Sequence, residues 1–143
     1  MTGEGAIRSP GRARQAGAEA LGSFFLFATV VGSGIMAERL AGGNVAVALL
    51  GNTLATAAIL FVLIVILAPV SGAQMNPAVS LVAALRRDLA WGDALFNILA
   101  QLGGGLLGVA AAHLMFDLPI LQVSERRGLE SASGRANSSP PSA

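Results

Sequence analysis

The residues best suited to chemistry gather in one short segment, SGAQMNPAVS, at residues 71–80. At its centre is the tripeptide Asn76, Pro77 and Ala78. Asn is a strong helix N-cap and Pro is favoured at the first helical position, so the tripeptide predicts that a helix begins here. The Asn76 oxygen can then cap the helix while the amide nitrogen donates a hydrogen bond to a water or hydroxyl group. The chemistry indicated is recognition of a small neutral solute.

The composition excludes several other kinds of site. Of the 143 residues, 54% are hydrophobic and only 12% are charged, whereas soluble domains have about 25% charged residues. The chain has no cysteine and one histidine, His113, which excludes thiol chemistry, disulfides and a histidine-pair metal site. The formal net charge of +1 argues against a nucleic-acid partner. We therefore expect a membrane protein that is not an enzyme and needs no cofactor or metal.

Three long apolar segments must position the tripeptide. They cover about residues 16–37, 45–68 and 93–116, and each is long enough as a helix to cross a hydrocarbon core of about 30 Å. The apolar segment 76–85 would be only about 15 Å long as a helix, half of that thickness. Its place between two spans predicts a re-entrant half-helix. The alternative is an amphipathic helix in a cytoplasmic loop.

A re-entrant segment carries a functional implication. Non-helical backbone persists at membrane depth only where protein buries it or a watery cavity solvates it. A half-helix N-terminus pointing into such a cavity would repel cations and protons. The expected fold is an all-α membrane protein with three transmembrane helices and one re-entrant half-helix, built around a pore or cavity.

The two ends of the chain show no hydrophobic periodicity. Residues 1–15 are rich in Gly and Arg, and residues 124–143 in Ser, Gly and Pro, so we expect disordered tails. Cytoplasmic loops are enriched in basic residues, and the expected spans give only a narrow bias towards a cytoplasmic N-terminus. On the N-terminal side lie Arg8, Arg12, Arg14, Arg86 and Arg87, and on the other side lie Arg39, Arg126, Arg127 and Arg135.

Two of the expected spans carry residues that should not face lipid. Small residues recur every four positions in the third span, and such a stripe lets another backbone approach closely. We expect this helix-packing stripe to contact a helix of the same chain or of another subunit. Its members are Ala100, Gly104, Gly108 and Ala112. In the second span, Asn52 and Thr56 share one face, which should turn towards protein or pore.

Taken together, these motifs resemble the major intrinsic proteins, the aquaporins and aquaglyceroporins. SGAQMNPAVS is similar to the first of the family's two Asn-Pro-Ala (NPA) boxes. AEALGSFFLF, residues 18–27, resembles the first family helix, and AQLGGGLLG, residues 100–108, resembles the third. The first two helices are most similar to bacterial aquaglyceroporins associated with arsenic resistance. The resemblance covers roughly residues 16–123 and implies half of an aquaporin-like fold.

The resemblance also implies a function and residue roles. The function is a channel for passive movement of water or small neutral solutes, such as glycerol and arsenite. Glu19 and Gln101 would brace the re-entrant loop. Thr56 falls at the second-helix position of the family's narrow filter, where water-selective members carry an aromatic residue, which indicates a wider aperture. The pore-centre box would be Asn76, Pro77 and Ala78.

Two features depart from the family pattern. Gln74 stands where many members have His, and these 143 residues contain neither helices four to six nor a second NPA box. The implied partners are membrane lipid, the solute, and either further copies of the chain, which form a tetramer in the family, or a second channel half. The alternative function is a truncated non-conducting fragment or one half of a split channel. The implied location is the inner or plasma membrane, crossed several times.

Overall fold

The computed structural model describes residues 11–119, which are helical with short connections and contain no strand. The helices are α1 (Arg12–Leu40), α2 (Val45–Ser71), α3 (Pro77–Leu85) and α4 (Trp91–Met115). Three of them, α1, α2 and α4, are long and apolar enough to cross a membrane. The predicted fold class is therefore confirmed: the chain is an all-α membrane protein with three long helices and one short one.

Helix α1 begins earlier than the sequence suggested. Residues 12–15, which we expected in a disordered tail, form its first turn, so that part of the tail prediction is wrong. The physical reason is mainly local, because Arg, Ala and Gln, the residue types at positions 12–15, favour helix. Arg12 Nε also lies 2.5 Å from Asp93 Oδ1 at the start of α4. The rest of that tail, residues 1–10, and the whole second tail, residues 124–143, lie outside the described residues.

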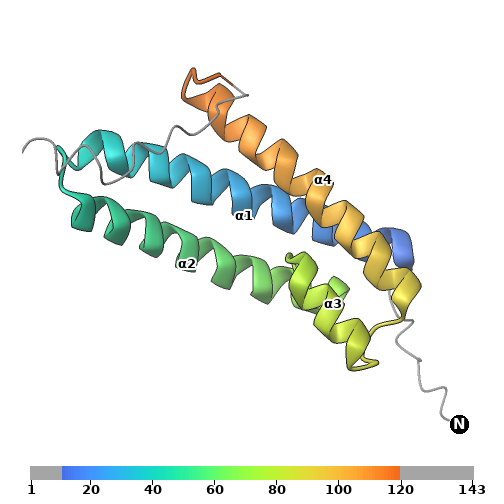
Figure 1. Ribbon diagram of the computed structural model, residues 1–143. Coiled ribbons are helices and arrows are strands. Elements are labelled where there is room, and N and C mark those ends of the chain that lie inside the picture. Colours follow the sequence, from blue (N-terminus) through green and yellow to red (C-terminus); the bar gives the residue numbers. More distant parts are fainter. Residues whose placement is uncertain (1–10, 120–143) are drawn as a thin grey trace, which may run out of the picture.

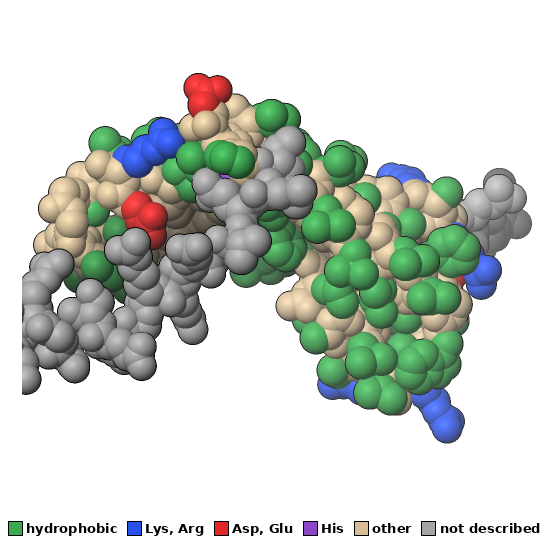
Figure 2. All heavy atoms as spheres, turned by 45° about the horizontal axis from the view of Figure 1, so that its top comes forward, with side chains coloured by type: hydrophobic (Ala, Val, Ile, Leu, Met, Phe, Trp, Pro, Cys, Tyr) green, Lys and Arg blue, Asp and Glu red, His purple; other side chains and the backbone are tan. Residues whose placement is uncertain are grey.

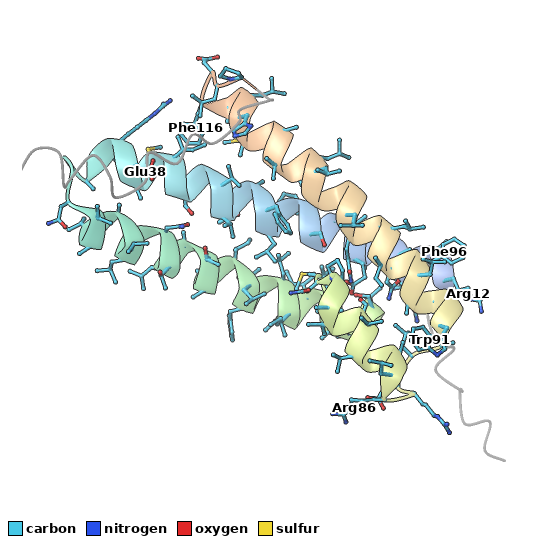
Figure 3. The ribbon with its side chains drawn as sticks, in the orientation of Figure 1. Arg12, Glu38, Arg86, Trp91, Phe96 and Phe116 are labelled. Atoms are coloured by element: carbon cyan, nitrogen blue, oxygen red, sulfur yellow. The ribbon has the colours of Figure 1, made fainter. Side chains whose placement is uncertain are left out.

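Helix α1 lies between α2 and α4, and α3 packs beside α4 (Figure 1). Helices α1 and α4 run in the same direction. The Arg12–Asp93 ion pair joins their first turns, and Arg39 Nη2 donates a 3.2 Å hydrogen bond to the Phe116 carbonyl oxygen at their far ends. Figure 3 shows the same separation, with Arg12 and Trp91 towards one end and Glu38 and Phe116 towards the other. Both ends of the α1–α4 pair are thus fixed by polar contacts.

Small residues bring the backbones of α1 and α4 together. A Cβ atom on Gly104 would collide with the Ala20 carbonyl oxygen, and one on Gly108 would collide with the Phe24 carbonyl oxygen. Ala112, one turn further along α4, is fully buried. The stripe expected to contact a neighbouring helix therefore contacts α1 of the same chain at Gly104 and Gly108.

The outer surface is largely apolar. Figure 2 shows hydrophobic side chains spread over the visible face, with the Arg, Asp and Glu side chains concentrated towards its ends. On α2, large side chains such as Leu54, Phe61 and Ile66 are 61–70% exposed. Water would not solvate such a surface favourably, so lipid or other protein must cover it.

Candidate functional site

The bend between α2 and α3 has an unusual backbone. Gly72, Ala73 and Met75 all have positive φ angles, of 85°, 49° and 44°. A left-handed conformation suits Gly, but at a non-Gly residue it costs on the order of 1–3 kcal/mol. Surrounding contacts must therefore hold Ala73 and Met75 in place.

The contacts that hold the bend converge on one buried carboxylate. Glu19 of α1 is 0% exposed. Its Oε1 accepts hydrogen bonds from Ser71 Oγ at 2.6 Å and from Gln74 N at 3.0 Å, and its Oε2 accepts one from Met75 N at 2.6 Å. A buried carboxylate is tolerated only when donors satisfy it, and here two of the donors are backbone N–H groups of the bend.

The hydrogen bonds continue from Glu19 through α4 to α3. Gln101 Nε2 donates to Glu19 Oε2 at 2.7 Å and to Ser80 Oγ at 2.9 Å. Ser80 Oγ in turn donates to Gln74 Oε1 at 2.6 Å. Gln101 and Ser80 are buried, at 2% and 0% exposed. We call Glu19, Gln101, Ser80 and Gln74 the buried relay; it joins α1, α4, α3 and the bend.

The family resemblance implied that Glu19 and Gln101 brace the bend, but it gave no role to the other residues in these contacts. Ser71 and Ser80 were missed, although two hydroxyl residues that flank the box in an apolar region are a visible signal. Gly22 was missed because its role depends on packing. A Cβ atom there would lie 2.6 Å from Met75 Sδ, so Gly22 leaves room for the Met75 side chain, which is 2% exposed.

Asn76 caps α3, as the tripeptide Asn-Pro-Ala predicted. Its Oδ1 accepts a 2.9 Å hydrogen bond from Ala78 N, and its carbonyl oxygen accepts one from Ser80 N at 3.1 Å. Pro77 occupies the first position of the helix. Asn76 and Ala78 are exposed, and within residues 11–119 Asn76 Nδ2 donates no hydrogen bond. The amide nitrogen is therefore available to an outside acceptor.

Thr56 lies apart from this cluster. It is half-buried on α2, and its hydroxyl lies 3.5 Å from Asn52 Oδ1, which also accepts a 2.8 Å hydrogen bond from Ser33 Oγ of α1. Asn52 therefore turns towards protein, as expected for a polar group in an apolar helix. No hydrogen bond joins Thr56 to the bend within the described range, so its place in a filter stays a prediction.

A cavity of about 140 Å³ lies beside the bend. Pro77 and Met75 line it together with Gln101, whose Oε1 accepts no hydrogen bond from the described residues. Its other lining residues are apolar: Phe27, Leu102, Gly105, Leu106 and Val109. Asn76 and Thr56 do not line it. Within residues 11–119, no group of three or more His, Cys, Asp or Glu side chains is placed to hold a metal ion.

Comparison with known proteins identifies the family of the chain. Residues 6–137 match the sequence model of the major intrinsic proteins. The chain is 55% identical to the aquaglyceroporin AqpS of Rhizobium meliloti (strain 1021) over 111 residues, which cover 78% of this chain and 47% of AqpS. The chain thus spans about half the length of that relative, and no solved structure shows a significant match. Because the family match covers most of the chain, the protein belongs to the major intrinsic protein family.

Proposed function

We propose that this chain forms one half of a channel through which water or small neutral solutes cross a membrane passively. The observation that carries the proposal is the bend. A nine-residue helix begins between two long apolar helices, and its Asn76 cap leaves an amide nitrogen exposed. Such a helix reaches about half of a hydrocarbon core of about 30 Å. The hydrogen bonds of the buried relay hold the backbone at the start of this helix, which supports a start of the helix about halfway through the hydrocarbon core.

Solute recognition rests on donors and on a positive helix end. The first turn of α3 presents the positive pole of its helix dipole, which disfavours cations and protons. Asn76 Nδ2 donates to the oxygen of a passing water or hydroxyl group. Glu19 and Gln101 act as bracing residues, because they hold the backbone that carries this donor. Pro77 and Ala78 complete the box at the pore centre.

A closed pore needs a second half-helix opposite α3. These 143 residues contain one NPA box, so the second comes from elsewhere in the same polypeptide, from another copy or from a separate chain. The exposed Asn76 and Ala78 leave a surface for it to cover. We propose that the chain works as an oligomer, a tetramer as in the family, or with a second channel half. Crosslinking in mild detergent that finds only monomers would contradict this.

The proposed solutes are glycerol and arsenite as well as water. Thr56 supports this choice, since a short hydroxyl side chain at a filter position leaves more room than an aromatic ring. The relative AqpS is named an aquaglyceroporin, which supports glycerol. A Thr56→Phe variant should lower glycerol and arsenite permeability more than water permeability. Equal effects on all three solutes would contradict the filter assignment.

We propose a plasma-membrane location with a cytoplasmic N-terminus. Arg12 and Arg86 lie towards the same end of the molecule, and Glu38 lies towards the other (Figure 3). The chain has no cysteine, so single-cysteine variants give clean labelling. An impermeant maleimide added to intact cells should label Gly43→Cys but not Arg87→Cys. The reverse pattern would overturn the orientation.

The main test is stopped-flow light scattering on vesicles that contain the chain. Asn76→Asp keeps the helix cap, because Asp caps as well as Asn, but it replaces the donor amide with a carboxylate. We expect water and glycerol permeability above empty vesicles, and a loss of that excess in Asn76→Asp.

The chain offers a matched control for this variant. Asn44 also caps a helix through its side chain, accepting from Ala46 N at 3.1 Å and Val47 N at 3.2 Å, at the far end of the molecule. Asn44→Asp should leave permeability unchanged. An equal loss in both variants would contradict the role of Asn76. Wild-type permeability equal to empty vesicles would instead favour the alternative function, a non-conducting fragment or a split-channel half that needs its partner.

A further inference from the structure

The buried relay has a donor-to-acceptor direction, which its assigned donor and acceptor atoms give. Backbone and hydroxyl donors of the bend occupy both Glu19 oxygens, so this carboxylate acts as an acceptor. The Gln101 atom that lies 2.7 Å from Glu19 Oε2 must therefore be its nitrogen. That nitrogen has two hydrogens, and the second is directed at Ser80 Oγ at 2.9 Å.

The Ser80 hydroxyl continues this series of hydrogen bonds to the bend. A hydroxyl group has one hydrogen, and because Ser80 Oγ accepts from Gln101, its own hydrogen is available for Gln74 at 2.6 Å. The structure assigns the Gln74 atom that faces Ser80 as the oxygen, Oε1, so the Ser80 hydroxyl is the donor in this hydrogen bond. This leaves both hydrogens of Gln74 Nε2 without an acceptor within residues 11–119.

Gln74 is placed where such a donor can act. It is half-buried rather than enclosed, and it lies on the bend two residues before Asn76. Its backbone N–H is held by Glu19 at 3.0 Å, so the position of the side chain is constrained at both ends. The group without an acceptor is a neutral amide, which offers donors without a charge that a change of pH could remove.

We propose that Ser80 is a positioning residue that orients the Gln74 amide, so that Gln74 Nε2 is a second hydrogen-bond donor to the permeating solute beside Asn76. The solute contact rests on the proposed channel function, whereas the orientation of the amide does not. The solutes favoured are small neutral molecules that carry oxygen lone pairs, and two donors on one bend hold such an oxygen more specifically than one. Cations are disfavoured by the same pair.

The orientation is tested without transport, by NMR of side-chain amides in the full chain in detergent micelles. In the wild type, Gln101 Nε2 hydrogens should exchange slowly with solvent and Gln74 Nε2 hydrogens quickly. Ser80→Ala should shift both amide signals, and Ser80→Thr should restore them because it keeps the hydroxyl. Ser23→Ala is the matched control, since Ser23 is equally buried and its hydroxyl has no partner among the described residues. Unchanged Gln74 signals in Ser80→Ala would overturn the proposal.

The solute contact is tested by glycerol permeability in vesicles. Gln74→Met keeps the side-chain length but removes the amide. Ser80→Ala keeps the amide and removes the hydroxyl group that orients it. Loss of one hydrogen bond of about 1 kcal/mol corresponds to about a fivefold effect, so each single variant should lower permeability by up to about fivefold. The double variant should be no worse than Gln74→Met, because both changes act through one group.

The outcomes separate this proposal from the channel function. Effects that multiply in the double variant would overturn the proposal, as would a Ser80→Thr variant that fails to restore the Gln74 amide signals. If wild-type vesicles match empty ones, the chain does not conduct by itself, and the solute contact proposed for vesicles of this chain fails with it. The NMR comparison still decides whether Ser80 orients the amide.

Discussion

Glu19 and Gln101 lie 82 positions apart in the sequence, yet their side chains meet at 2.7 Å in the interior. Both are buried, at 0% and 2% exposed. Their contact joins α1 to α4 next to the bend, and the same carboxylate holds the backbone N–H groups of Gln74 and Met75. The packing of two long helices and the conformation of the bend therefore depend on one side chain.

Glu19→Gln should destabilise the protein strongly. The amide nitrogen cannot accept a hydrogen bond, so two of the four donors that face Glu19 lose their acceptor. A hydrogen bond to a charged group contributes about 1.5–3 kcal/mol, and the expected loss is therefore at least about 3 kcal/mol. Thermal unfolding in detergent measures it. Glu38→Gln, at an exposed site on the same helix, should change the melting temperature little; equal shifts in the two variants would contradict the bracing role.

Neighbouring glycines of α4 should respond oppositely to alanine. Gly104→Ala places a methyl group against the Ala20 carbonyl oxygen and must separate α1 from α4. Such overpacking costs about 1–3 kcal/mol or more. A Cβ on Gly103 meets nothing within 4 Å, so Gly103→Ala should be neutral or stabilising by up to about 1 kcal/mol. The melting temperatures of the two variants measure this difference in stability, and similar values would refute the close packing of α4 against α1 at Gly104.

Gly22→Ala should disturb the bend through Met75. The new Cβ would lie 2.6 Å from Met75 Sδ and 2.8 Å from Leu67 Cδ1. Because Met75 has a strained backbone and is buried, we expect lower stability and lower solute permeability. Met75→Ala in the same chain should relieve the clash and recover part of the stability. Gly17→Ala is the control, with open space around its Cβ; a double variant worse than the sum of its single changes would contradict the mechanism.

The Arg12–Asp93 ion pair should contribute little and depend on salt. The Arg12 side chain is 70% exposed and Asp93 22%. Exposed ion pairs contribute about 1 kcal/mol or less, and salt at about 1 M reduces the Debye length to about 3 Å. Arg12→Gln should lower the melting temperature slightly at low salt and not at high salt. Arg14→Gln is the comparison on the same exposed turn, and a loss in Arg12→Gln that persists at high salt would argue for a packing role instead.

Local features of the fold could be predicted from the sequence. Length and apolarity identify three spans, because crossing a hydrocarbon core needs about 20 apolar residues. The sequence Asn-Pro-Ala predicts the start of α3, because capping depends only on residues within one turn. The similarity of SGAQMNPAVS to a family box predicts the kind of site, and the match over residues 6–137 shows the family.

Only the tertiary structure decided which residues meet. The small-residue stripe of α4 is visible in the sequence. The sequence does not show that Gly104 of this stripe packs against the backbone of Ala20. Contacts between distant segments also decide the Arg12–Asp93 ion pair, the pocket that Gly22 leaves for Met75 and the direction of the buried relay. The reason is physical. Capping and span length are set within a few consecutive residues, whereas helix crossings and buried hydrogen bonds are set by packing summed over the whole chain.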